Sequence, residues 1–235
     1  MRHIIIASTS TVHGSGYLEY LLKDLELFFK DTEDILFIPF ARPDGLSHDN
    51  YTQKAKSAFS KIKKTVKGIH EYENPFDAIK KAKGIFVGGG NTFVLTNQLY
   101  KNNLVDALKT VVNNGTPYLG TSAGSNICGP TIKTTNDMPI VYPPSFNALG
   151  LVPFNINPHY LDPDTTSKHM GETRETRIKE FHNFNTQPVV GLREGSWLLV
   201  EDKSIRLKGS LSARVFEYNK APYEIEPNTE LNTLN

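Results

Sequence analysis

The sequence contains one cysteine, Cys128, among 235 residues. A single thiol cannot close an intramolecular disulfide, so we expect packing to stabilise the fold, as in a reducing compartment. No apolar run approaches the roughly 18 residues that span a bilayer. The short run at 4–6 is followed by polar residues without a signal-peptide cleavage pattern. These absences predict a cytoplasmic protein.

An excess of charge of one sign is also lacking. Lys and Arg number 26 and Asp and Glu number 25, which gives a net charge of +1. A near-neutral chain offers no electrostatic footprint for nucleic acid or an anionic membrane. We therefore expect neither partner, and we expect a monomer or a homodimer.

The first half alternates short β-branched runs with helical stretches, which predicts a parallel sheet with helices on both faces. Strands are expected at 4–6, 35–38, 66–70, 84–87, 117–119 and 189–192. Helices are expected at 17–30, 47–64, 76–83, 104–113 and 172–184, with another after Asn91. Antiparallel strands in a meander are expected at 197–200, 205–207 and 214–218. Without a repeat or a dividing linker, we expect one domain over 1–235, frayed after about 222.

Loops at the carboxyl ends of strands hold the ligand sites of open α/β sheets. Four loops qualify here, at 8–16, 40–45, 88–92 and 120–126. The last two are dense in glycine, so we expect them to carry the chemistry.

Residues 120–124 read Gly-Thr-Ser-Ala-Gly and match G-x-S-x-G between an apolar strand and a candidate helix. In this context the motif predicts Ser122 as a nucleophile, held in a strained turn that requires small residues two places on either side. The amides at the start of the helix favour a developing negative charge. The alternative is that Ser122 only caps the helix.

Residues 88–92 read Gly-Gly-Gly-Asn-Thr, so backbone amides can approach a substrate closely. The loop lacks the lysine of a P-loop and the spacing of G-x-G-x-x-G, which disfavours nucleotide binding. Beside the serine turn it predicts an oxyanion hole from the amides of Gly90 and Ala123. A plain tight turn is the alternative.

His159 is the leading candidate among seven histidines for the base that a serine needs, because it follows a strand that ends in a proline-stiffened turn. A structural histidine is the alternative. The base in turn needs a carboxylate. Asp137 and Glu194 both lie in suitable turns, and either chain order is possible. A surface-turn acid is the alternative for each.

Six motifs in order make the sequence resemble the peptidase E group, the α-aspartyl dipeptidases, of a serine peptidase family that also contains cyanophycinase. The similarity runs from the first strand to about Phe216. The motifs are VGGGNTF (87–93), GTSAGSNI (120–127), PTIKTTNDMPIV (130–141), INPHY (156–160), GETRETRI (171–178) and GLREGSW (191–197).

The resemblance implies a three-layer α/β/α sandwich with a mostly parallel sheet, as in class I glutamine amidotransferases. It also implies hydrolysis of small peptides that begin with aspartate, without a metal or a cofactor. Ser122 matches the nucleophile and His159 the base, and the third member matches either Asp137 or Glu194. Gly90 and Ala123 match the oxyanion-hole positions.

Selection of aspartate requires a cation or several donors for its β-carboxylate. Arg174 is the leading candidate, Arg193 and Asn91 are weaker ones, and Asp137 is a candidate for the substrate's α-ammonium group. A solvated helix-surface arginine is the alternative for Arg174. Two residues depart from the family pattern: Thr121 stands where tryptophan is common in bacterial relatives, and Arg193 where proline is frequent.

Other functions remain open at this point. A cyanophycinase-like peptidase or an esterase could use the same scaffold. A non-catalytic binding module and a nucleotide-binding protein are further alternatives. The presence of Ser122, His159 and a candidate acid argues against the non-catalytic module.

Overall fold

The computed structural model describes the whole chain except residues 44–46, 165, 167, 169 and 235. The end of the loop expected at 40–45 therefore lies outside the described residues. The helices are α1 (Leu22–Phe28), α2 (His48–Phe59), α3 (Pro75–Lys81), α4 (Thr92–Lys101), α5 (Val105–Asn113), α6 (Ala123–Asn126) and α7 (Arg174–Phe181). The strands are β1 (His3–Ala7), β2 (Asp34–Ile38), β3 (Thr65–Gly68), β4 (Ile85–Val87), β5 (Tyr118–Thr121), β6 (Asn155–Asn157), β7 (Val189–Leu192), β8 (Trp197–Glu201), β9 (Ser204–Lys208), β10 (Ala213–Phe216) and β11 (Tyr223–Ile225).

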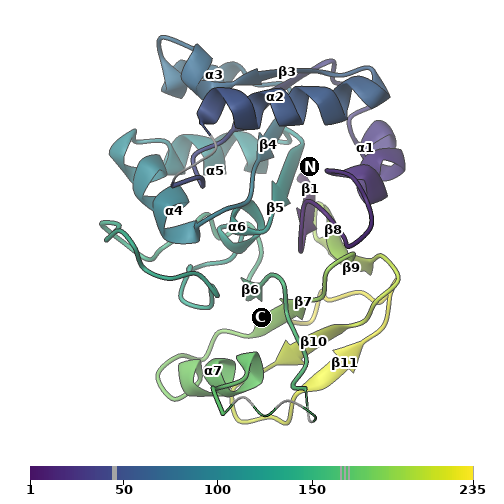
Figure 1. The fold of residues 1–235 in the computed structure, drawn as a ribbon, viewed down its shortest axis with the longest axis vertical. Helices are drawn as coiled ribbons and strands as arrows, with labels where there is room; N and C mark the ends of the chain where they lie inside the picture. The colour runs from purple at the N-terminus through teal and green to yellow at the C-terminus, as the bar shows by residue number, and fades with distance from the viewer. Residues whose placement is uncertain (44–46, 165, 167, 169, 235) are drawn as a thin grey trace.

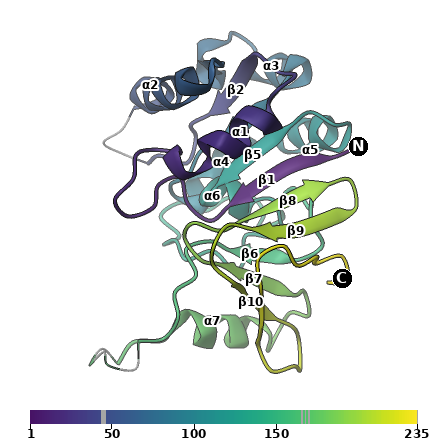
Figure 2. The same cartoon turned by 90° about the vertical axis from the view of Figure 1, so that its right-hand side faces the viewer.

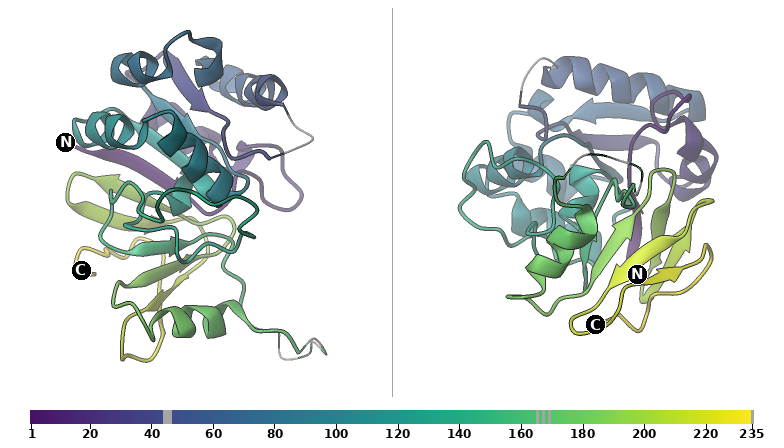
Figure 3. Two further views of the ribbon diagram at one scale, coloured as in Figure 1. Left: turned by 90° about the vertical axis from the view of Figure 1, so that its left-hand side faces the viewer. Right: turned by 60° about the horizontal axis from the view of Figure 1, so that its bottom comes forward.

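The larger sheet has seven strands in the order β3-β2-β4-β5-β1-β8-β9. The first five strands are parallel to one another, and β8 and β9 add an antiparallel edge. Side chains alternate between the two faces along β1. Ile4 and Ile6 pack on the side of α3, α4 and α5, whereas Ile5 and Ala7 pack on the side of α1 and α2. The expected α/β fold with a mostly parallel sheet is confirmed, and Figure 1 and Figure 3 show helices on both faces.

A smaller sheet of four strands, in the order β11-β10-β7-β6, lies beside the larger one (Figure 2). Its inner face, including Val190 and Leu192, joins the same core as α4 and α5. Its outer face, including Val189 and Phe216, packs under Ile178 of α7. The pair β6–β7 is parallel, and the pairs β7–β10 and β10–β11 are antiparallel.

The expected C-terminal meander is wrong in its pairing. Strands β8 and β9 pair within the larger sheet, but β10 crosses to the smaller sheet and pairs with β7. Alternating hydrophobicity identifies strands without specifying their partners. In place of a frayed tail, residues after 222 form β11, and Leu231 and Leu234 are buried.

Side-chain caps mark the start of α2 and α4, as they do for α3 and α7. The Ser47 hydroxyl accepts the backbone N–H of Asn50 at the start of α2, and the Asn91 side chain accepts the N–H of Val94 at the start of α4. The helix expected to reach about 64 ends earlier, at Phe59, because a 3₁₀ turn and the left-handed Lys63 follow it. No helix in the described ranges is long and apolar enough to cross a membrane.

Candidate active site

Ser122 occupies a strained turn between β5 and α6, with φ 53° and ψ −111°. A side chain on either flanking glycine would collide with backbone: a Cβ at Gly120 would lie 2.4 Å from Gly124 O, and one at Gly124 would lie 2.2 Å from Val87 O. Ser122 itself is only partly buried. Its side chain makes no capping bond to α6, so the helix-cap alternative is wrong.

A chain of two hydrogen bonds links Ser122 through His159 to Glu194. Ser122 Oγ lies 2.9 Å from His159 Nε2, and His159 Nδ1 lies 2.6 Å from Glu194 Oε1. An ionised carboxylate only accepts hydrogen bonds, so Nδ1 donates to Glu194. In the neutral imidazole, Nε2 then accepts the serine O–H, which is the proton arrangement that a general base requires.

The parallel pairing of β6 and β7 explains why the imidazole meets Glu194. Asn157 is in register with Gly191, so the turns that follow the two strands lie side by side. Ser8, the first residue after β1, joins these turns to the larger sheet. Its hydroxyl accepts the backbone N–H of His159 at 2.9 Å and donates to Leu192 O at 2.7 Å.

Asp137 lies at the N-terminus of α4 rather than beside the imidazole. Its Oδ2 accepts the backbone N–H of Thr92 at 2.7 Å and the hydroxyl of Thr135 at 3.1 Å. The first turn of a helix favours a negative charge, which fits this position. The structure therefore brings His159 together with Glu194 and keeps Asp137 separate.

At each position of the 88–90 turn, a side chain would collide with a different neighbouring group, which explains why all three residues are glycine. A Cβ at Gly88 would lie 2.6 Å from the Tyr51 hydroxyl, and one at Gly89 would lie 2.9 Å from Ser122 Cβ. Gly90 has φ +144°, and a Cβ there would lie 2.2 Å from Ala41 O. The turn therefore packs directly against Ser122.

Free backbone donors gather beside Ser122. Within the described part of the chain, the N–H groups of Gly89, Gly90 and Ala123 have no hydrogen-bond partner. Ala123 is the first residue of α6, where a helix leaves its N–H groups unpaired. Unpaired donors next to a nucleophile are what an oxyanion hole needs.

The three arginine and asparagine candidates differ in availability. Arg174, the first residue of α7, is half-buried, and its guanidinium makes no hydrogen bond or ion pair with the described residues. It lines a pocket of about 310 Å³ together with Asn136 and Arg177. The Asn91 amide is occupied at both ends, by Val94 N and by Met138 O. Arg193 is occupied as well, because it binds two carboxylates.

The family model described as peptidase family S51 matches residues 4–208. This chain belongs to peptidase family S51. The sequence resemblance to that family of serine peptidases is therefore confirmed.

Two curated relatives match this chain over nearly its whole length. A protein named peptidase E from Streptomyces coelicolor is 47% identical over 232 residues, which cover 99% of this chain and 94% of the relative. A protein named probable alpha-aspartyl dipeptidase from Drosophila melanogaster is 44% identical over 236 residues, which cover 99% and 97%. The chain therefore matches both relatives over nearly their whole lengths.

Two solved structures share the fold of this S51 member. A peptidase from an acI-B1 Actinobacterium gives a TM-score of 0.74 at 14% identity and covers 98% of this chain and 96% of its own. A putative peptidase E protein from Listeria monocytogenes EGD-e gives 0.66 at 21% identity, with coverage of 89% and 98%.

Sequence reasoning missed several polar residues that support the S51 site. Ser8 carries one signal, because it is the first residue of the loop at 8–16 that follows the strand predicted at 4–6. Thr92 and Thr135 carry none, because their hydroxyls lie 3.1 Å apart across 43 positions of the chain. Such contacts arise from tertiary packing and leave no local pattern.

Arg193 has a structural environment in this S51 member. It binds Asp162 at 2.7 Å and Glu224 at 2.8 Å, and it also donates to Ser212 O. Its bonds, with those from Ser212 and Arg214, hold the pKa of Glu224 at about 2, well below its usual value. Arg193 therefore links the end of β7 to β11 through its ion pair with Glu224 and is not a free cation.

The lowered pKa of Glu224 predicts a pH dependence of stability. The native carboxylate stays ionised down to about pH 2, whereas the unfolded group takes up a proton near its ordinary value of 4.5. The native state therefore loses this stabilisation as the pH falls from 4.5 to 2. Glu224→Gln should lower the Tm at pH 7 and flatten its fall in that acid range, as measured by calorimetry. The exposed Glu226→Gln is the control, and parallel curves for both variants would contradict the prediction.

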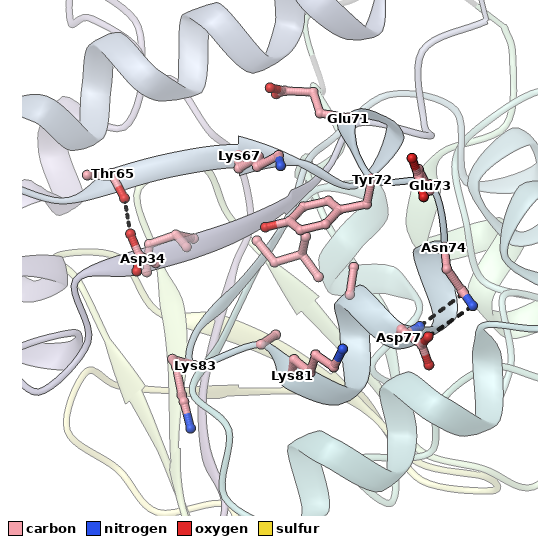
Figure 4. A pocket seen from close by; sticks show the side chains of 14 residues that line it. Asp34, Thr65, Lys67, Glu71, Tyr72, Glu73, Asn74, Asp77, Lys81 and Lys83 are labelled. Carbon is pink, nitrogen blue, oxygen red and sulfur yellow. Dashed lines mark hydrogen bonds between the residues drawn. The ribbon is translucent and has the colours of Figure 1, made fainter.

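A groove of about 900 Å³ lies away from these residues, on β2, β3 and α3 (Figure 4). It carries both signs of charge, and the Lys67 ammonium lies 4.0 Å from the ring centroid of Tyr72. Among the described residues, its lining includes neither Ser122 nor His159. The chemistry of the side chains, rather than the volume of the groove, locates the candidate site.

Proposed function

We propose that this chain is a serine dipeptidase that releases the N-terminal aspartate of Asp-Xaa peptides through an acyl-enzyme on Ser122. The observation that carries the proposal is the hydrogen-bonded chain from Ser122 to His159 to Glu194. The relative named probable alpha-aspartyl dipeptidase supports the substrate class. A family whose members use a serine supports the nucleophile.

The reaction begins when Ser122 Oγ bonds to the carbonyl carbon of the aspartyl residue and its proton moves to His159 Nε2. Glu194 stabilises the resulting imidazolium through Nδ1. The amides of Gly90 and Ala123 bind the oxyanion, and each donor in comparable sites is worth about 3–4 kcal/mol. His159 then gives its proton to the leaving amine as the C–N bond breaks, and water hydrolyses the ester by the reverse path.

Cys128 does not compete as a nucleophile. Its side chain is fully buried. Burial raises the pKa of the Cys128 thiol to about 12. At neutral pH the thiolate is therefore negligible. A reduced, buried thiol also fits our proposal that the enzyme acts in the cytoplasm.

Substrate recognition requires two opposite charges close together. The bonds of Asp137 at the α4 N-terminus use Oδ2, so Oδ1 would bind the α-ammonium group of the substrate. Arg174 would bind the β-carboxylate. Burial and the neighbouring Arg177 lower the pKa of Arg174, whereas Asp137 and Glu194 act in the opposite direction. An arginine remains charged under these conditions, so its unpaired guanidinium favours an anionic partner.

A substrate panel tests the proposal and the role of Arg174 together. We expect kcat/KM for Asp-Leu to exceed that for Glu-Leu, Ala-Leu and β-Asp-Leu. Arg174→Gln should lower kcat/KM for Asp-Leu about 10²-fold, because truncating one partner of a desolvated charge pair costs about 2–5 kcal/mol. The rate for Ala-Leu should change little.

Arg177→Gln is the matched control, since Arg177 lies on the same helix, lines the same pocket and contacts Glu172 at 3.8 Å. We expect its kcat/KM to stay within about threefold of wild type, as for exposed ion pairs. Equal cleavage of Ala-Leu and Asp-Leu by the wild type would refute the proposed substrate class. Retained preference in Arg174→Gln would refute the role of that arginine alone.

A further inference from the structure

Tyr51 of α2 connects the hydrophobic core to the glycine turn beside the nucleophile. Its side chain is completely buried. Its hydroxyl donates to Gly89 O at 3.1 Å and accepts a hydrogen bond from the Tyr17 hydroxyl at 3.4 Å. The absence of a side chain at Gly88 makes room for this contact, since a Cβ there would lie 2.6 Å from the hydroxyl. A polar group thus reaches the turn from a helix that contributes nothing else to the chemistry described above.

The ring of Tyr51 is held on several sides. Phe37 packs edge-on against it at 5.0 Å between ring centroids, and Tyr17 does so at 6.2 Å. The Arg42 guanidinium lies 4.7 Å from the ring centroid, a favourable cation–π distance. The ring is therefore held against β2 through Phe37, which limits how far its hydroxyl can shift if the glycine turn moves.

The peptide between Gly89 and Gly90 lies between two glycines. Rotation of this peptide changes ψ of one residue and φ of the next, and neither glycine carries a side chain that would resist it. In a trans peptide the C=O and the N–H point in opposite directions. A bond that holds the Gly89 carbonyl therefore also sets the direction of the Gly90 N–H.

The carbonyl and the N–H of this peptide differ in their hydrogen bonding. Among the described residues, Tyr51 is the only partner of the Gly89 carbonyl, and the Gly90 N–H has no partner. We propose that Tyr51 is a positioning residue that holds the Gly89–Gly90 peptide so that the Gly90 N–H stays directed at the oxyanion. The inference rests on the proposed function, which gives that N–H its role in the reaction.

Tyr51→Phe tests the inference because it removes one oxygen atom and keeps the buried ring. Complete loss of an oxyanion donor costs roughly 10²–10³ in kcat. Loss of the anchoring bond leaves the productive orientation partly populated, so we expect kcat for Asp-p-nitroanilide to fall about tenfold. KM should stay within about twofold, because the donor acts in the transition state rather than in the ground state.

Two further variants separate positioning from packing. Tyr17→Phe removes only the hydroxyl that supports Tyr51, and it should lower kcat by about two- to threefold. Tyr100→Phe removes a hydroxyl that donates to Asn147 O at 3.1 Å, in a different part of the chain, and should leave kcat unchanged. A loss of thermal stability in Tyr51→Phe with unchanged kcat, or a proportionate rise in KM, would overturn the inference.

An activated ester separates the failure of this inference from the failure of the proposed function. Hydrolysis of p-nitrophenyl acetate, corrected for the rate of Ser122→Ala, also passes through an oxyanion but does not require an aspartyl group. If only the ester is cleaved, the substrate class is wrong, and the tenfold loss in Tyr51→Phe is still expected. Equal ester rates in the wild type and Tyr51→Phe overturn the inference. A wild type that cleaves neither compound overturns both.

Discussion

Replacing Ser122 by alanine should lower kcat for Asp-p-nitroanilide by at least about 10³-fold. The variant keeps the donors of the oxyanion hole and the substrate-binding charges, but it has no oxygen atom to form the acyl-enzyme. Loss of a nucleophile in comparable serine hydrolases leaves only residual catalysis by binding and the oxyanion hole. Comparison of kcat between Ser122→Ala and the wild type at saturating substrate tests this prediction.

Stability should hardly change in this variant. Alanine meets the same strain as serine at φ 53°, and the side chain lost is partly exposed, so we expect a change within about 1 kcal/mol. The exposed Ser57→Ala on α2 is the matched control and should retain full activity. A Ser122→Ala enzyme with more than a tenth of the wild-type rate would exclude an acyl-enzyme at this residue.

Glu194→Gln and Asp137→Asn should have different kinetic effects. The amide at 194 cannot stabilise the imidazolium and can present an N–H to Nδ1, which favours the wrong tautomer of His159. In the Ser-His-Asp triad, replacing the aspartate by asparagine lowers kcat by about 10⁴, and we expect a loss of about 10²–10⁴ here. Asp137→Asn keeps an oxygen for Thr92 N, so kcat should fall less while KM rises about tenfold.

Both variants replace a carboxylate by an amide of the same shape, so each serves as the steric control for the other. Steady-state kinetics with Asp-p-nitroanilide separate kcat from KM. The opposite pattern, with a large kcat loss in Asp137→Asn and a mild one in Glu194→Gln, would reverse the two roles. Similar Tm values in both variants would show that the difference is chemical.

The sequence carried enough information to locate the turns but not to pair them. Ser122, His159 and the glycine turn each follow an apolar strand, and a strand's end is visible in local patterning. Whether Asp137 or Glu194 meets the imidazole depends on the alignment of Asn157 with Gly191, a pairing that joins residues 34 positions apart. Local patterns do not encode such pairings.

The same reasoning explains the other differences between expectation and structure. Arg193 follows a strand and looked available, but Asp162 and Glu224 bind it from segments distant in the sequence. Strand β10 joins β7, and its Val215 pairs with Val190 and is buried in the main core. Burial and ion pairing are properties of the packed chain, so residue type and spacing alone could not reveal them.

Ser122 and His159 follow strands of different sheets, and their order along the chain has a consequence for biosynthesis. A ribosome completes the strand and turn of Ser122 before it adds His159 and, later still, Glu194. Chains generally fold from the N-terminus during synthesis. The hydrogen-bonded chain from Ser122 to Glu194 therefore cannot form until the segments that carry β6 and β7 have been synthesised.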